Sequence, residues 1–184
     1  MKRRAVCIVL ALLIALQGPA AVSNVKAAEE EVNTLENAGI ETYEKEIVKI
    51  TKTGFVADSY NGVDAVYRKG GSDGCNMTYS CAAYVKKYYS AVHKVTVNNL
   101  NRGCTPKSST GKFKVVKTPK EGDVVYCPTS SGSTHWAIVK HVDTEEKEVV
   151  LIEQNYKWQQ GGQTVCAVNR SISWSDGKFF RLSR

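Results

Sequence analysis

Residues 135–155, "HWAIVKHVDTEEKEVVLIEQN", contain two segments with strand-like composition on either side of a short charged turn. The first, "HWAIVKHVD", alternates between apolar and other residues, and the second, "KEVVLIEQN", carries a continuous apolar run. Both patterns are typical of β-strands, and two strands joined by a short turn pair antiparallel. The stretch therefore predicts an antiparallel β-hairpin.

Other segments of the C-terminal half repeat this pattern of short strands separated by turn residues. We expect strands within "GDVVYC" (122–127), which follows the turn "TPKEG", within "GGQTVCAVNRSI" (161–172) and within "GKFFRLS" (177–183). Together with the hairpin, these segments predict an antiparallel sheet of about five strands.

A helix is predicted ahead of these strands. In "SCAAYVKKYYSAVH", residues 80–93, apolar or aromatic side chains stand at positions 81, 84, 85, 88 and 92, the spacing of one helix face. Ser80 is well suited as the N-cap, and Thr78 offers a second hydroxyl there. Cys81 would then lie in the first turn. One helix followed by antiparallel strands indicates an α+β domain.

The first 27 residues have the organisation of a secretory signal peptide. "MKRR" is basic, and "AVCIVLALLIAL" is an apolar run that is too short to span a bilayer comfortably. "VSNVKA" then offers small residues for cleavage, while an uncleaved N-terminal anchor is the alternative. Residues 28–53 are acidic at first and poor in large apolar groups, so we expect a surface helix or a partly ordered leader there. The domain itself is expected at residues 54–184.

The chain is only mildly positive once the signal peptide is removed. The full sequence has 25 basic and 18 acidic residues, and residues 1–27 hold four of the basic ones and no acidic one. The remaining net charge of +3 suits a neighbour of anionic polymers but does not require a nucleic acid partner. No second long apolar segment follows, so we expect a soluble, single-domain protein without a membrane partner.

Cysteines are the next indicator of function, and five of them follow residue 27: Cys75, Cys81, Cys104, Cys127 and Cys166. Secretion permits disulfides, and the odd number leaves one thiol over. The simplest scheme has two disulfides, whose pairing the sequence leaves open, and one functional thiol. None of these cysteines is spaced C-x-x-C, which disfavours zinc. We expect no metal and no cofactor.

Cys81 is the candidate for the functional thiol. At a helix N-terminus, backbone N–H groups and the helix dipole favour the thiolate, which is the nucleophilic form. A buried structural cysteine or one half of a disulfide is the alternative. His93 would lie about 18 Å away at the far end of the same helix. His135 instead begins a strand beside a loop, where functional residues often lie, and His141 is expected to face solvent or pack against the turn.

The second strand of the hairpin can supply a partner for His135. If Val142 faces Glu148 across the turn, the numbers of paired residues sum to 290. His135 then faces Asn155, and Glu153 is its diagonal neighbour on the same sheet face. A carboxylate there would orient the imidazole. A register shifted by one residue would separate these groups, and a solvated Glu with a turn-capping Asn is the alternative.

These features together resemble the CHAP domain, the cysteine, histidine-dependent amidohydrolase/peptidase family. The family has a cysteine at a helix start, followed after two residues by an aromatic residue and valine, as in "CAAYV" (81–85). The family continues with a Gly-Asp strand, as in "EGDVV", and with a histidine followed by small and aliphatic residues, as in "HWAIV". It ends with a strand that closes in Glu-x-Asn, as in "EQN", and with an aromatic-rich strand, as in "GKFFRL". With the lead-in "YNGVDAVY", the resemblance covers about residues 54–184.

By position, the resemblance implies that Cys81 is the nucleophile and His135 the general base. It implies that Glu153 is the orienting acid and Asn155 a supporting polar residue. Ser80 occupies a position where the family often has Gln or Asn.

An oxyanion site and a substrate groove are also implied. The backbone N–H of Cys81 is the expected oxyanion donor, with Asn76 as a second candidate beside Ser80. Trp136 and Trp158 are candidates to line the groove, although a core role is more common for tryptophan.

The implied fold is a papain-like α+β domain, with the nucleophile helix packed on the sheet. The implied reaction is hydrolysis of an amide bond in bacterial peptidoglycan, either the muramoyl–L-alanine amide or a peptide bond, by a secreted, monomeric, wall-associated enzyme. Some members bind calcium through an acidic loop, but Asp64 and Asp73 are isolated here, so no calcium is expected. An inactive binding or inhibitory module on the same fold is one alternative. A secreted cysteine protease or transamidase acting on proteins is another.

Overall fold

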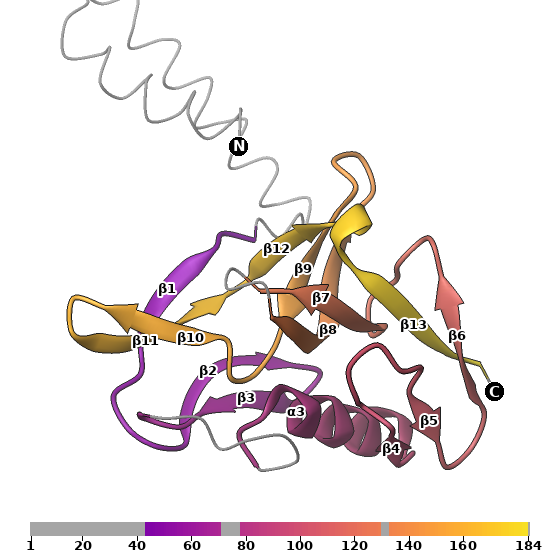
Figure 1. Ribbon diagram of the computed structural model, residues 1–184, viewed down its shortest axis with the longest axis horizontal. Helices are drawn as coiled ribbons and strands as arrows, with labels where there is room; N and C mark the ends of the chain where they lie inside the picture. The colour runs from indigo at the N-terminus through magenta and orange to yellow at the C-terminus, as the bar shows by residue number, and fades with distance from the viewer. Residues whose placement is uncertain (1–42, 71–77, 130–132, 184) are drawn as a thin grey trace, which may run out of the picture. The chain divides into compact units, whose positions relative to one another are not determined.

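A computed structural model describes residues 43–70, 78–129 and 133–183 (Figure 1). Among these residues, no helix has the length and apolar character needed to cross a membrane. The secondary structure confirms an α+β domain with antiparallel sheets. In chain order the elements are β1 (Glu46–Lys49), β2 (Phe55–Tyr60), β3 (Val63–Tyr67), α3 (Cys81–Tyr88), the π-helical turn η2 (Tyr89–His93), β4 (Val97–Asn98), β5 (Lys107–Ser108), β6 (Lys112–Val116), β7 (Val124–Pro128), β8 (Thr134–Asp143), β9 (Glu148–Ile152), β10 (Lys157–Gln160), β11 (Gln163–Val168), β12 (Arg170–Ser173), the 3-10 turn η3 (Trp174–Asp176) and β13 (Lys178–Ser183).

The main sheet has six antiparallel strands in the order β12-β9-β8-β7-β13-β6. The expectation of about five strands missed β6, an edge strand whose exposed lysines hide its pattern. The segment 161–172 was expected to be one strand. It is divided at Asn169, which has a φ of 52°, and only its second half, β12, joins the main sheet.

Smaller sheets flank the main one. β1, β11 and β10 form a three-stranded sheet, while β2 pairs with β3 and β4 with β5. Because β1 pairs with β11 along its whole length, sheet structure begins ahead of the domain boundary expected at residue 54. The expected signal peptide, and the segment up to residue 42, lie outside the described residues.

Helix α3 packs on one face of the main sheet, next to the β2–β3 hairpin (Figure 1). Its buried side chains share a core with strands β7, β8, β9 and β13. Two tyrosine hydroxyls add specific anchors, since Tyr84 donates to the carbonyl of Val63 and Tyr89 to that of Gly122. The helix was expected to continue to about residue 92, but from Tyr89 it continues as the π-helical turn η2.

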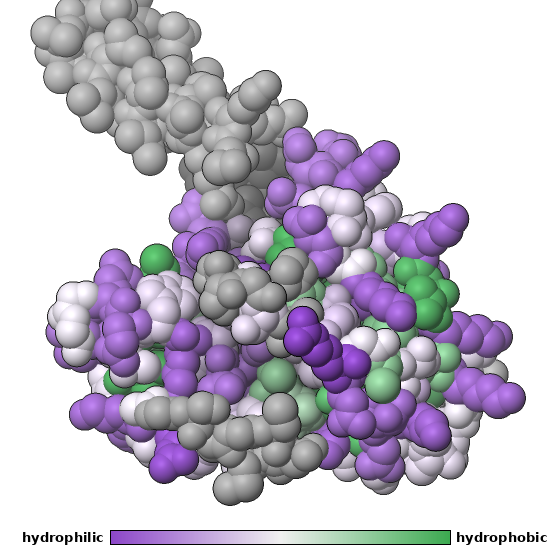
Figure 2. Space-filling model, viewed as in Figure 1, coloured by the Kyte–Doolittle hydropathy of each residue, from purple (hydrophilic) through white to green (hydrophobic). Residues whose placement is uncertain are grey.

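A second core lies against the opposite face of the main sheet, and its members alternate along the strands with those of the first: Val125, Cys127, Ala137, Val139, Val149, Leu151, Ile172 and Phe179. Burial on both faces fixes the register of the central strands. Outside the cores, the exposed large apolar side chains of the described residues stand on separate strands, at Ile47, Val56 and Val115. Polar side chains predominate on the face that Figure 2 shows.

Candidate active site

Cys81 is the first residue of α3, and Ser80 caps the helix as predicted. Ser80 has extended backbone angles, and its Oγ accepts a hydrogen bond from the backbone N–H of Ala83 at 3.1 Å. The cap fixes where the helix begins, so the Cys81 side chain lies at the positive end of the helix dipole. The thiol is partly buried and packs against the first core.

His135 is the second residue of β8, where it is 5 % exposed. It pairs with Cys127 on the neighbouring strand β7. The imidazole lies beside the Cys81 side chain, and each group shifts the pKa of the other, so the helix start and the strand start meet at the thiol.

The pairing predicted for the hairpin is wrong at the turn and correct near the site. Val142 pairs with Val149 rather than with Glu148, one residue away from the prediction. A β-bulge between Val139 and His141 then moves the register by one residue. On the His135 side of the bulge, at Val139 and Ile138, the paired residue numbers sum to 290, as predicted, which places the end of β9 beside His135.

Lys140 is the extra residue at this bulge, and its side chain is anchored. Its Nζ lies 2.9 Å from both carboxylate oxygens of Asp58 and 3.0 Å from Oδ1 of Asn169. These contacts tie the bulge to β2 and to the junction between β11 and β12. The bulge is therefore a fixed part of the fold that sets the register at the site.

Glu153 lies behind His135, with its Oε2 3.1 Å from His135 Nε2. This is ion-pair distance, although the N–H of Nε2 is not directed along a hydrogen bond. Such contacts commonly tighten only when substrate is bound. Since Nε2 faces Glu153, Nδ1 is the nitrogen available to the thiol.

Arg170 holds the same carboxylate from the opposite side. Its Nε donates to Oε1 of Glu153 at 2.7 Å and its Nη2 donates to Oε2 at 2.8 Å. The guanidinium also lies 4.1 Å from the centre of the Tyr156 ring, whose edge meets His135. The four side chains form one continuous, mostly buried cluster behind the thiol.

The pKa values of this cluster favour a thiolate–imidazolium pair. Burial raises the pKa of Cys81, but His135 and the backbone N–H groups of Trp136 and Ala82 outweigh burial and lower it. Burial lowers the pKa of His135, but Cys81 and Glu153 raise it to about 9. The lowered pKa of the thiol and the raised pKa of the imidazole both favour the state in which the two groups are charged.

The carboxylate of Glu153 is ionised in this environment. Burial alone would raise its pKa, but Arg170 and His135 lower it to about 2. Burial also lowers the pKa of Arg170, and Glu153 raises it above its ordinary value.

Strand β3 positions the segment that carries Glu153. The hydroxyl of Tyr67 donates to the backbone carbonyl of Glu153 at 3.0 Å. Gln154 is 1 % exposed, and its Oε1 accepts from the backbone N–H of Val66 at 2.9 Å. Its Nε2 donates to the carbonyls of Thr78 and Ser80 at 3.0 and 3.2 Å. Gln154 therefore links the end of β9, strand β3 and the chain that leads into Cys81.

The other predicted site residues occupy different positions. Asn155 has a left-handed backbone, with a φ of 65°, and no hydrogen bond joins it to His135 in the part of the chain that the structure describes. The Ser80 hydroxyl caps α3. The Trp136 side chain is 4 % exposed and packs against Tyr126 and Phe180, so it is a core residue and does not line a groove. Asn76 lies outside the described residues.

The remaining histidines lie away from the thiol. His93 packs on the rings of Tyr88 and Tyr89 at the end of η2. His141 is half-exposed, stacks on Tyr43 and lies 3.1 Å from Glu121.

The expectation of two disulfides is wrong for the described residues, where Cys81, Cys104, Cys127 and Cys166 all carry free thiols. Cys127 belongs to the core on one face of the main sheet, and Cys166 packs with Ile50 and Tyr67 in a separate cluster. Cys75 lies outside the described residues.

Sequence reasoning missed Arg170, Gln154 and Tyr156. A charged residue between the apolar segments "TVCAV" and "SI" is a signal for Arg170, because an arginine in a buried strand needs an acidic partner. The sequence does not show which acid this is. Gln154 and Tyr156 flank Asn155 and carry no comparable signal.

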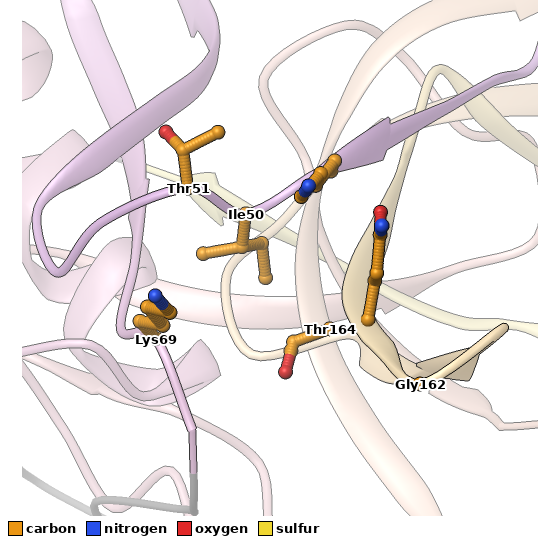
Figure 3. A pocket seen from close by; sticks show the side chains of 7 residues that line it. Ile50, Thr51, Lys69, Gly162 and Thr164 are labelled. Carbon is orange, nitrogen blue, oxygen red and sulfur yellow. The ribbon is translucent and has the colours of Figure 1, made fainter.

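A pocket of about 350 Å³ lies elsewhere, between β1, the loop after β3 and the turn into β11 (Figure 3). Ile50, Lys69 and Thr164 are among its lining residues, and none of the cluster around Cys81 is. Among the described residues, no group of three or more His, Cys, Asp or Glu side chains is arranged to hold a metal ion.

A thiol at a helix start, a histidine in contact with it and a buried carboxylate behind the histidine form the arrangement of a cysteine-dependent acyl-transfer site. Comparison with protein families agrees, because residues 71–155 match the family model of the CHAP domain. This segment is therefore similar to the CHAP domain, the family that the sequence motifs indicated, and CHAP domains are typically cysteine, histidine-dependent amidohydrolases or peptidases. No curated protein sequence matches the chain.

Proposed function

We propose that the protein is a secreted peptidoglycan hydrolase that cleaves an amide bond through Cys81. The observation that carries the proposal is the contact of Cys81 with His135, backed by the buried carboxylate of Glu153. The CHAP family supports the substrate class, since the family comprises peptidoglycan hydrolases, amidases and peptidases. The signal-like N-terminus supports secretion and a location at the cell wall.

Acylation is the first half of the proposed reaction. The Cys81 thiolate attacks the carbonyl carbon of the scissile amide, and the carbonyl π electrons move onto its oxygen. The backbone N–H of Cys81, at the N-terminus of α3, is the donor that we assign to this oxyanion. As the C–N bond breaks, the His135 imidazolium gives its proton to the leaving amine, and a thioester to Cys81 remains.

Deacylation uses the same groups in the reverse roles. His135, now neutral, removes a proton from a water molecule as the water attacks the thioester. The C–S bond then breaks, the carboxylic product leaves, and the thiolate and imidazolium are restored. Glu153 stabilises the imidazolium whenever it carries the positive charge and keeps the ring orientated.

Two features of the cluster suit this chemistry. The lowered pKa of Cys81 increases the fraction of nucleophilic thiolate, and the raised pKa of His135 keeps the proton that the leaving amine needs. The residues that support them belong to α3, β8 and the end of β9, which are tied together by Gln154 and by the shared core. The geometry is therefore present before substrate binds.

Digestion of purified peptidoglycan by the protein, with mass spectrometry of the fragments, tests the proposal. Free L-alanine amino termini identify an amidase, and other new termini identify an endopeptidase. Cys81→Ala is expected to abolish release. Cys104→Ala is the matched control, because Cys104 is also a partly exposed free thiol but is not in contact with His135.

Three outcomes would overturn the proposal. Equal release by the Cys81→Ala variant would exclude this nucleophile. If the wild-type protein releases nothing from peptidoglycan but cleaves or cross-links proteins, the site belongs to a protease or transamidase. If it binds the wall without cleavage, the domain is a binding module.

A further inference from the structure

We propose that Arg170 is a positioning residue of this site, which holds the Glu153 carboxylate in place behind His135. The inference rests on the proposed function, because it assigns a partner to the residue that orients the general base. Arg170 follows the segment matched by the CHAP family model, which ends at residue 155. It reaches the site because β12 pairs with β9, with Arg170 opposite Leu151.

The geometry of the contact leaves the carboxylate little freedom. Two parallel hydrogen bonds of 2.7 and 2.8 Å join the guanidinium to the two oxygens of Glu153. The side chains are 8 % and 2 % exposed, so water does not compete for these contacts. A planar fork that holds both oxygens prevents the carboxylate from rotating, and this keeps Oε2 directed at His135 Nε2.

The charge of Arg170 has a second role. A buried carboxylate without a countercharge takes up a proton, and a neutral acid would stabilise the imidazolium of His135 far less. His135 also carries a positive charge beside Glu153, but it gives up its proton during the reaction. Burial raises the pKa values of Tyr67, Cys127 and Cys166, so these three side chains are neutral around pH 7. Arg170 is therefore the fixed cation that keeps Glu153 ionised.

The Arg170 guanidinium is itself held by further side-chain contacts. It lies over the Tyr156 ring at 4.1 Å, and its Nη2 donates to Sγ of Cys127 at 3.4 Å. A cation over an aromatic face is stabilised by the ring electrons. These contacts restrain the guanidinium in addition to its bonds with Glu153, so that the fork stays aligned with the carboxylate.

The rate of alkylation of Cys81 by iodoacetamide as a function of pH tests this role without any substrate. Site-resolved mass spectrometry of the full-length protein separates Cys81 from the other thiols. Wild type is expected to react at a nearly constant rate around neutral pH, because its thiolate–imidazolium pair persists there. Arg170→Met is expected to react at least tenfold more slowly at pH 7, with a profile moved toward that of an ordinary thiol.

Further variants separate positioning from general support of the fold. Arg170→Lys keeps the charge but cannot hold both carboxylate oxygens of Glu153, and we expect its Cys81 to be alkylated several-fold more slowly than in wild type at pH 7. The double variant Arg170→Met/Glu153→Gln is expected to react no more slowly than Glu153→Gln alone, because Arg170 acts through Glu153. Arg181→Met is the matched control, since Arg181 makes the same two-pronged contact with Asp123 at 2.9 and 2.8 Å but does not touch the site.

The outcomes decide the proposal independently of hydrolysis. A wild-type profile in both Arg170→Met and Arg170→Lys would overturn it, as would a further tenfold loss in the double variant or an equal loss in Arg181→Met. If Arg170→Met does not fold, as judged by circular dichroism, the Lys variant decides. A protein that alkylates as expected but leaves peptidoglycan intact would retain the role of Arg170 and refute only the proposed substrate.

Discussion

Replacing Gln154 by methionine should destabilise the domain by about 3 kcal/mol. Methionine has nearly the same length but no strong hydrogen-bonding group, so three hydrogen bonds are lost, with the N–H of Val66 and the carbonyls of Thr78 and Ser80. The Ser80 carbonyl keeps its bond from the N–H of Tyr84. Each lost hydrogen bond costs about 1 kcal/mol, more where the group stays buried. Because a domain of this size is stable by only about 5–15 kcal/mol, the loss should be measured easily.

Urea denaturation followed by tryptophan fluorescence provides the measurement, since Trp136 is buried in the core. Gln159→Met is the matched control: Gln159 is exposed on β10 and makes a single side-chain hydrogen bond, to Thr164 at 3.0 Å. We expect this control to stay within about 0.5 kcal/mol of wild type. If Gln154→Met lost less than about 1 kcal/mol, the reasoning that this amide links three segments would be refuted.

Three further results are expected. Peptidoglycan release should fall as the pH rises through about 9, because His135 then loses the proton that the leaving amine needs, whereas a rate that still climbs there would contradict an imidazolium donor. Ser80→Ala should cost about 1 kcal/mol in urea denaturation and Ser80→Asn much less, since only the latter keeps a capping oxygen; equal losses would argue against the cap. In the native protein, iodoacetamide should label Cys81 and Cys104, because both thiols are partly exposed. After denaturation without reductant it should also label the buried thiols of Cys127 and Cys166. A thiol labelled only after reduction would reveal a disulfide.

The depressed pKa of Glu153 gives a fourth result, in the acid range. The pKa of this carboxylate is about 2 in the folded protein, against an ordinary value of 4.5. It therefore contributes stability that is present above about pH 4.5 and is lost as the pH falls through about 2. Denaturation midpoints of Glu153→Gln should fall less steeply between pH 5 and 2 than those of wild type, and parallel curves would show that this titration does not stabilise the fold.

Features that depend on neighbours in sequence were predicted well. The start of α3 follows from the hydroxyl of Ser80 and the apolar spacing after it, which act within one helical turn. The ends of the β8–β9 hairpin were placed correctly near His135. The pairing at its turn was not, because nothing in the residue types marks Lys140 as a bulge. Only its contacts with Asp58 and Asn169 do so.

Features that depend on distant residues were not predictable in this way. Arg170 and Glu153 meet because β12 pairs with β9. The order of strands in a sheet cannot be predicted from the residues of any one segment. The number of cysteines suggested disulfides, but an odd or even number carries no information on the distances between the thiols. Cys127 and Cys166 are packed in separate clusters as small apolar residues, a role that free cysteine often has.

The position of β13 has a consequence for the timing of folding during synthesis. β13 follows every other described strand in the chain, yet it lies inside the main sheet, between β7 and β6. Its Phe179 and Phe180 enter the two opposite cores. On the ribosome, the β8–β9 hairpin can form early, but β6 stays unpaired with the sheet until residues 178–183 emerge. The nascent domain is therefore completed only once β13 has been made, and deletion of residues 178–183 would divide the sheet internally rather than trim its edge.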